Sequence, residues 1–288
     1  MSTSYWERVH ATGLDVPADR ALDDLTAELT RMLGDPDPGT RDGTALPVLA
    51  TWIERGVYDD LLAGLGDGMT AGLTVGLGED GTDTVFRRSS CALVLERCIA
   101  RDNEHSLVPG DKVLDWGDRL ATWLLREQDL RGWVVDKGWA HGMAHGADAL
   151  GRLAESRHLG GPELEVLLDV VAERLLAPVE TLFGAGEPDR IAAAVVRLLG
   201  RDLVAIEVVE RWLARLAARA GTLSGADGRD PFLAGGNAQA FLRALYLQLA
   251  LGPHPPPQRA DLLLAVVEAV RSSNPQVLAS GQDAATAR

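Results

Sequence analysis

Apolar residues recur at intervals of three and four positions along most of this 288-residue chain. The series Leu22, Leu25, Leu29 and Met32 is typical, and Gly34 follows it as a helix stop. This spacing gathers apolar side chains on one face of an α-helix. No segment shows the apolar–polar alternation of a half-buried strand. The pattern therefore predicts an all-α fold of amphipathic helices packed against one another.

The predicted helices are numerous and joined by short loops. Glycines weaken the prediction over residues 57–77, whereas strong helical patterns cover residues 83–101, 111–127, 138–157, 161–177, 188–199, 203–220, 236–251 and 258–272. Helices in such number are expected to stack as antiparallel pairs in a HEAT- or armadillo-like solenoid, with a closed α/α barrel as the alternative. We expect a single helical-repeat domain over residues 1–272 and a flexible C-terminal tail over 273–288.

Acidic residues outnumber basic ones, and the formal net charge is −14. A chain this acidic repels phosphate backbones and anionic membranes, so neither is an expected partner. No apolar run reaches the ~20 residues that span a bilayer. The N-terminus lacks the basic start and apolar stretch of a secretory signal. Cys91 and Cys98 lie two helical turns apart, about 10 Å, which is too far for a disulfide. These features predict a cytoplasmic protein with reduced thiols.

Ionisable and aromatic residues are concentrated in one segment, residues 129–148. It holds Lys137, one of only two lysines in the chain, and two of the seven tryptophans. On a helix that begins near residue 138, four polar side chains would share an arc of roughly 60°. They are His141, His145, Asp148 and Arg152, and glycines and alanines flank them. Small flanking residues would let a ligand or another helix approach this stripe.

Three interpretations of the stripe remain open. It is a solvated helix face, a metal site, or the acid–base and binding groups of a pocket. A divalent metal on His141, His145 and Asp148 is the weaker alternative, because His-Gly-Met-Ala-His lacks the glutamate of the zinc-protease pattern. No cofactor is otherwise expected.

In the pocket interpretation, His141 and His145 transfer protons and Asp148 orients one of them. Arg131 and Lys137 would hold an anionic group, and Trp133 and Trp139 would form flat walls. Arg152 completes the expected ligand-binding set on the predicted helix.

Two motifs carry a resemblance to a known family. The run Arg131-Gly132-Trp133-x-x-x-Lys137-Gly138-Trp139-Ala140-His141-x-x-Ala144-His145-x-Ala147-Asp148 resembles the signature of the bacterial DUF2785 family. The later run Asn237-x-x-x-Phe241-Leu242-Arg243-x-Leu245-Tyr246 resembles that family's C-terminal motif. The resemblance covers roughly residues 80–255 and implies a helical fold in a bacterial setting, without naming a reaction. It also adds Asn237, Arg243 and Tyr246 as residues expected to line the same cavity.

The expected function is that of a small-molecule pocket centred on the helix 138–152. One version is a non-redox acid–base enzyme of the lyase, cyclase or hydrolase type, in specialised metabolism or resistance. The alternatives are a non-catalytic ligand-binding module and a protein-interaction scaffold. The expected partner is a small anionic or polar molecule, with a protein partner or a second copy of the chain as further alternatives.

Overall fold

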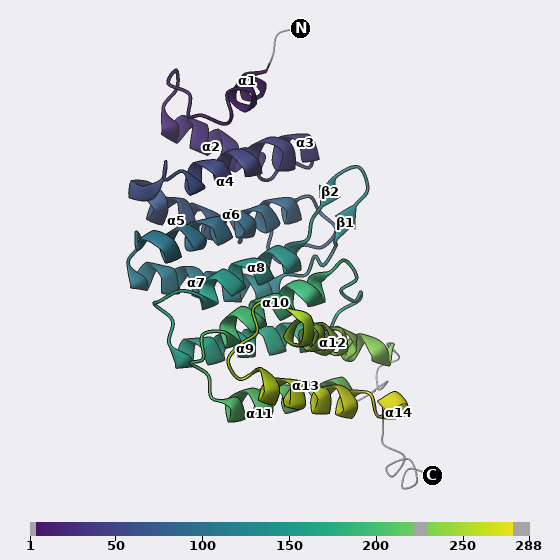
Figure 1. The fold of residues 1–288 in the computed structure, drawn as a ribbon. Coiled ribbons are helices and arrows are strands. Elements are labelled where there is room, and N and C mark those ends of the chain that lie inside the picture. The colour runs from purple at the N-terminus through teal and green to yellow at the C-terminus, as the bar shows by residue number, and fades with distance from the viewer. Residues whose placement is uncertain (1–3, 222–229, 279–288) are drawn as a thin grey trace. The chain divides into compact units, whose positions relative to one another are not determined.

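The computed structural model describes residues 4–221 and 230–278, and nearly all of their regular secondary structure is helical (Figure 1). The prediction of an all-α fold is confirmed. The strands of the described residues form a single two-stranded sheet. The chain divides into two compact units, Met1–Ala149 and Leu150–Arg288. Each unit has its own buried core.

The first unit packs its helices as pairs around α6. Helices α4 and α5 both contact α6, and α5 also contacts α7. The core contains the fully buried Trp52, Trp116, Trp123 and Phe86. The elements are α1 (Tyr5–Ala11), α2 (Leu22–Met32), α3 (Pro38–Thr40), η1 (Arg41–Ala45), α4 (Leu46–Glu54), η2 (Asp59–Leu61), α5 (Leu62–Gly72), α6 (Thr84–His105), α7 (Gly110–Arg126), β1 (Trp133–Val134), β2 (Gly138–Trp139) and α8 (Gly142–Ala154), whose last turns belong to the second unit.

A β-hairpin stands where the sequence predicts a polar turn and the start of a helix. Strands β1 and β2 pair in antiparallel register, and α8 begins only at Gly142. The predicted helix start near residue 138 is therefore wrong by about one turn. The helix starts later because of the backbone conformation before it: Asp136, Gly138 and His141 have φ values of 63°, 80° and 51°. A right-handed helix cannot include such left-handed residues.

The second unit is built from pairs of long helices. Helix α10 packs on α12, α11 packs on α13, and α12 also contacts α13. In its core, the rings of Trp212 and Phe241 meet edge to face with centroids 5.8 Å apart. The elements are α9 (Gly161–Leu176), α10 (Glu187–Leu199), α11 (Ile206–Gly221), η3 (Pro231–Ala234), α12 (Gly236–Leu251), α13 (Arg259–Ser273) and α14 (Pro275–Leu278).

The remaining fold predictions have different outcomes. The described helices do not close into a barrel within either unit, and they pack as pairs. The HEAT- or armadillo-like solenoid and the single domain over 1–272 stay predictions. Of the predicted tail, residues 275–278 form α14, and residues 279–288 lie outside the described part of the chain. Among the described residues, no helix has both the length and the apolar character needed to span a bilayer.

Candidate functional site

The two faces of the hairpin differ in exposure. Val134 and Ala140 turn inward and pack with Val85 and Phe86 of α6. Trp133 lies directly opposite Trp139 in the strand register, and the two indoles are 59% and 44% exposed. Their rings meet edge to face, with centroids 5.1 Å apart and planes inclined by 79°. The outer face of the hairpin is thus aromatic, although an outward face is ordinarily polar.

Two histidines extend this aromatic face. The His141 ring stacks on Trp139 with centroids 4.4 Å apart, and the His145 ring meets His141 at 5.8 Å. We call Trp133, Trp139, His141 and His145 the aromatic row. The hairpin supplies the tryptophans, the residue before α8 supplies His141, and the first turn of α8 supplies His145. The structure therefore brings together four of the predicted site residues in a continuous series of ring contacts.

The predicted polar stripe needs one correction. His141 precedes α8, and its left-handed backbone removes it from the helical arc. His145, Asp148 and Arg152 do lie on α8, and all three are half-buried. The residues of α8 between them are buried. This stretch of helix therefore reaches the surface only at these three side chains. They are neither enclosed nor fully solvated.

Ser89 of α6 contacts the histidine end of the row. Its Oγ lies 2.7 Å from Nδ1 of His145 and also donates a hydrogen bond to the Ala140 carbonyl. Ser89 is fully buried, so water does not compete for these contacts. One hydroxyl thus ties α6 both to the end of the hairpin and to α8.

Both cations expected to hold an anion are engaged by carboxylates. Lys137 Nζ lies 2.7 Å and 2.8 Å from the two oxygens of Asp83. Arg131 donates from Nε and Nη2 to Asp129, at 2.8 Å and 2.6 Å, and this hydrogen bonding raises the pKa of the Arg131 guanidinium. The Lys137–Asp83 pair ties the turn of the hairpin to the residue before α6, whereas the Arg131–Asp129 pair lies in the segment before β1. Their positive charges are matched locally, which weakens the expectation of an anionic ligand.

Two buried arginines stabilise the hairpin and the segment that leads into it. Arg41 donates to the Lys137 carbonyl at 2.7 Å and stacks on Phe86. Arg88 pairs with Glu127 at 2.5 Å and 2.8 Å, and both side chains are fully buried. Glu127 in turn accepts from the Asp129 backbone N–H at 3.0 Å. The start of the hairpin is therefore held by a buried charge network rather than by its own short strands.

The candidates from the later motif lie in the second unit. Asn237 is buried and accepts a hydrogen bond from the Phe183 N–H at 2.8 Å. Arg243 donates to Asn274 at 2.7 Å, and Arg243 and Tyr246 line a cavity of about 480 Å³ against α13. That these residues share a cavity with the first motif stays a prediction. Arg152 of α8 pairs at 3.1 Å with Glu155, the residue that follows the helix.

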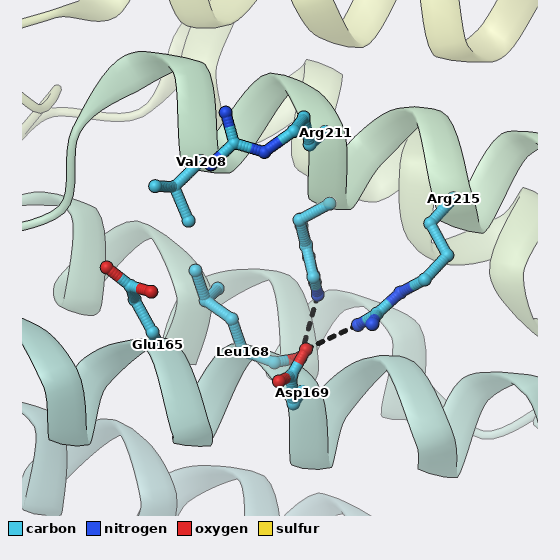
Figure 2. A pocket seen from close by; sticks show the side chains of 7 residues that line it. Glu165, Leu168, Asp169, Val208, Arg211 and Arg215 are labelled. Carbon is cyan, nitrogen blue, oxygen red and sulfur yellow. Dashed lines mark hydrogen bonds and ion pairs between the residues drawn. The ribbon is translucent and has the colours of Figure 1, made fainter.

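A further hollow of about 250 Å³ lies between α9 and α11 (Figure 2). Asp169 pairs there with Arg215 at 2.5 Å, and Trp212 donates to the Leu168 carbonyl at 2.8 Å. The charged side chains on its rim are exposed, and such pairs are common surface features. We see no site chemistry in this hollow. In the described part of the chain, no group of three or more His, Cys, Asp or Glu side chains is placed to hold a metal ion, so the divalent-metal alternative gains no support.

Comparison with known families supplies one match. The family model DUF2785, described as a protein of unknown function, matches residues 73–247. The chain belongs to the DUF2785 family. The DUF2785 region contains the hairpin, the whole aromatic row, Ser89 and the Arg88–Glu127 pair, whereas Arg41 lies before it. No curated protein and no solved structure matches the chain.

Several residues of the candidate site in this DUF2785 protein are not predicted by the sequence. Ser89 and Asp83 lie about fifty residues before the histidines, on or beside another helix. A signal does exist for Ser89: the residues from Arg87 to Ser90 are four consecutive polar residues, and four consecutive helical residues point in all directions, so some of them must face the core. Buried polar residues of this kind need partners, and here the partners are Glu127, His145 and the Ala140 carbonyl.

Proposed function

We propose that the aromatic row binds a small polar molecule that has a flat apolar part. The observation that carries this proposal is the exposure of Trp133 and Trp139 on a hairpin whose opposite face is buried. Exposed indoles on a fixed support present a large apolar area with little conformational entropy to lose on binding. Contiguous exposed apolar patches are characteristic of ligand-binding and protein-interaction surfaces.

Local charge argues against an anionic ligand. The carboxylates of Asp83 and Asp129 match the charges of Lys137 and Arg131. The whole chain carries a net charge of −14, which repels anions at a distance. We therefore favour a polar ligand over an anionic one. Its apolar part would lie on the indoles and its polar edge would face His141 and His145.

The two histidines give the site the capacity for acid–base chemistry. An imidazole can accept and return a proton near neutral pH, which suits a non-redox lyase, cyclase or hydrolase in a bacterial cytoplasm. Binding without turnover uses the same groups. The binding step is common to both versions, and it is the step that we propose to test first.

Saturation-transfer NMR with a fragment library tests the binding step. The library contains neutral planar amides and glycosides together with their carboxylate analogues. We expect neutral fragments to bind the wild-type protein, and Trp133→Ala/Trp139→Ala to abolish that binding. Phe232→Ala is the matched control, because Phe232 is 45% exposed, close to the 44% of Trp139, and lies in the second unit. Equal binding to all three proteins, or preferential binding of the carboxylates, would refute the proposal.

One observation favours a second function, a protein interface. Val135, in the turn of the hairpin two residues after Trp133, is 74% exposed, so it adds to the exposed apolar area of the hairpin. Self-association through this turn is the simplest form. Sedimentation velocity over a hundredfold concentration range would reveal it as a dimer that Val135→Glu disperses. A concentration-independent monomer would remove this alternative and leave fragment binding unaffected.

A further inference from the structure

The hydrogen bonds of Ser89 define which nitrogen of His145 carries a proton. A serine hydroxyl has one hydrogen to donate and lone pairs to accept with, whereas a backbone carbonyl only accepts. In the bond between Ser89 Oγ and the Ala140 carbonyl, Ser89 must therefore be the donor. Its single hydrogen is used there. The contact of 2.7 Å to His145 then requires that Nδ1 of His145 donates to Ser89 Oγ.

We propose that Ser89 is a positioning residue that holds the neutral imidazole of His145 in the Nδ1–H tautomer, which makes Nε2 the proton-accepting nitrogen. Isolated imidazole side chains favour the opposite tautomer, so the assignment is a property of this fold. Burial of Ser89 strengthens the effect, because no water can offer the hydroxyl a different partner.

The tautomer of His145 does not depend on the proposed function. Only its consequence for a bound ligand rests on that function. A ligand placed on the aromatic row would meet His145 as a base at Nε2, ready to take a proton from an acidic C–H, O–H or N–H group. The proton would bind the Nε2 lone pair and the substrate would become its conjugate base, while the Nδ1 proton stays on His145, hydrogen-bonded to Ser89 Oγ. Ser89 does not touch the ligand in this scheme. It sets the orientation and the proton position of the residue that does.

Nitrogen NMR of the full-length protein tests the tautomer directly, without any ligand. The protein is labelled with ¹⁵N-histidine, and two-bond ¹H–¹⁵N correlations are recorded at rising pH until His145 is neutral. His145→Gln assigns its signals by their disappearance. We expect a pyrrole-type Nδ1 and a pyridine-type Nε2 in the wild-type protein. The reverse pattern in the wild-type protein would overturn the proposal.

Three variants separate positioning from general structural support. Ser89→Ala should move most of the neutral His145 population to the Nε2–H tautomer, whereas Ser89→Thr should retain Nδ1–H because it keeps the hydroxyl. Ser90→Ala is the matched control, since Ser90 is a buried neighbour on the same helix. An unchanged tautomer in Ser89→Ala would refute the role of Ser89. If Ser89→Ala does not fold, Ser89→Cys, with its weak thiol acceptor, should show a mixture of both tautomers, and an unshifted Nδ1–H population would refute the role.

The outcomes for binding and for the tautomer are independent. If the wild-type protein binds no fragment but shows a pyrrole-type Nδ1, the proposed function is refuted and the role of Ser89 is supported. Fragment binding with a pyridine-type Nδ1 would refute only the role of Ser89.

Discussion

Trp139 and His141 lie nearly parallel, with ring centroids 4.4 Å apart and planes inclined by 19°. They are two residues apart on an extended backbone, and the left-handed conformation of His141 ends that extension where α8 begins. The stack therefore depends on the same backbone feature that delays the helix. It joins the exposed tryptophan face to the histidine pair and makes the four rings one surface.

Trp139→Ala should release the His141 ring. An aromatic pair contributes about 0.5–1.5 kcal/mol beyond the area it buries, so the free energy of unfolding should fall by at least about 1 kcal/mol. The ring-current shift on the His141 carbon-bound protons should disappear in proton NMR. Trp133→Ala is the control, because Trp133 contacts Trp139 rather than His141. His141 resonances that move equally in both variants would contradict the stack.

The buried ion pair between Arg88 and Glu127 should be far more sensitive to substitution than any exposed pair. Glu127→Gln leaves the Arg88 guanidinium uncompensated in a site where both side chains are fully buried. Removing one partner of such a pair destabilises proteins by about 3–5 kcal/mol. Urea denaturation followed by circular dichroism measures the change. Trp123 also donates to Glu127 at 2.7 Å, so its fluorescence should respond as well.

The Arg119–Asp115 pair is the matched control for this prediction. It lies on α7, its atoms are 3.1 Å apart, and both side chains are more than a third exposed. Exposed i,i+4 pairs contribute about 0.3–0.5 kcal/mol, so Arg119→Ala should lower stability by less than 1 kcal/mol. Similar losses for Glu127→Gln and Arg119→Ala would contradict the burial of the Arg88–Glu127 pair.

Both cysteines should resist alkylation in the folded protein. Burial raises the pKa of the Cys91 thiol to about 11, and burial also raises the pKa of Cys98. A raised thiol pKa means less thiolate, so at pH 8 about one Cys91 in a thousand carries the reactive form. Iodoacetamide at pH 8 should label neither residue until urea unfolds the chain, as mass spectrometry would show. Stoichiometric labelling with retained helicity would contradict this prediction.

Local sequence pattern predicts the long helices but not the hairpin. Residues 236–251 are predicted as a helix and form α12, because the apolar period and the Gly–Pro break after it are both local signals. The hairpin has only two paired residues in each strand. Its conformation depends on Arg41, whose contact with the Lys137 carbonyl spans 96 positions. No window of sequence around residue 138 contains that information.

The candidate site shows the same contrast between local sequence signals and long-range contacts. The concentration of tryptophan, lysine and histidine in residues 129–148 identifies the segment, and ring contacts do join four of its members. Helical projection then fails for His141, since one left-handed residue changes the direction of every side chain before it. The partners of Lys137 and His145 lie on or beside α6, more than fifty positions away. Only the packing of α6 against the hairpin reveals them.

Two helical glycines should respond to alanine in opposite directions. A Cβ at Gly146 of α8 would lie 2.4 Å from Leu124 Cδ2 and 2.9 Å from the Trp123 ring, closer than real contacts allow. Gly146→Ala should therefore lower stability by about 1–3 kcal/mol, despite the better helix propensity of alanine.

A Cβ at Gly68 of α5 would meet nothing within 4 Å. Gly68→Ala should raise stability by about 0.4–1 kcal/mol, because alanine restricts the unfolded chain. Urea denaturation of the two variants measures both values under identical conditions. If Gly146→Ala stabilised the protein as much as Gly68→Ala does, the close approach of α8 to Trp123 and Leu124, on which the position of His145 depends, would be wrong.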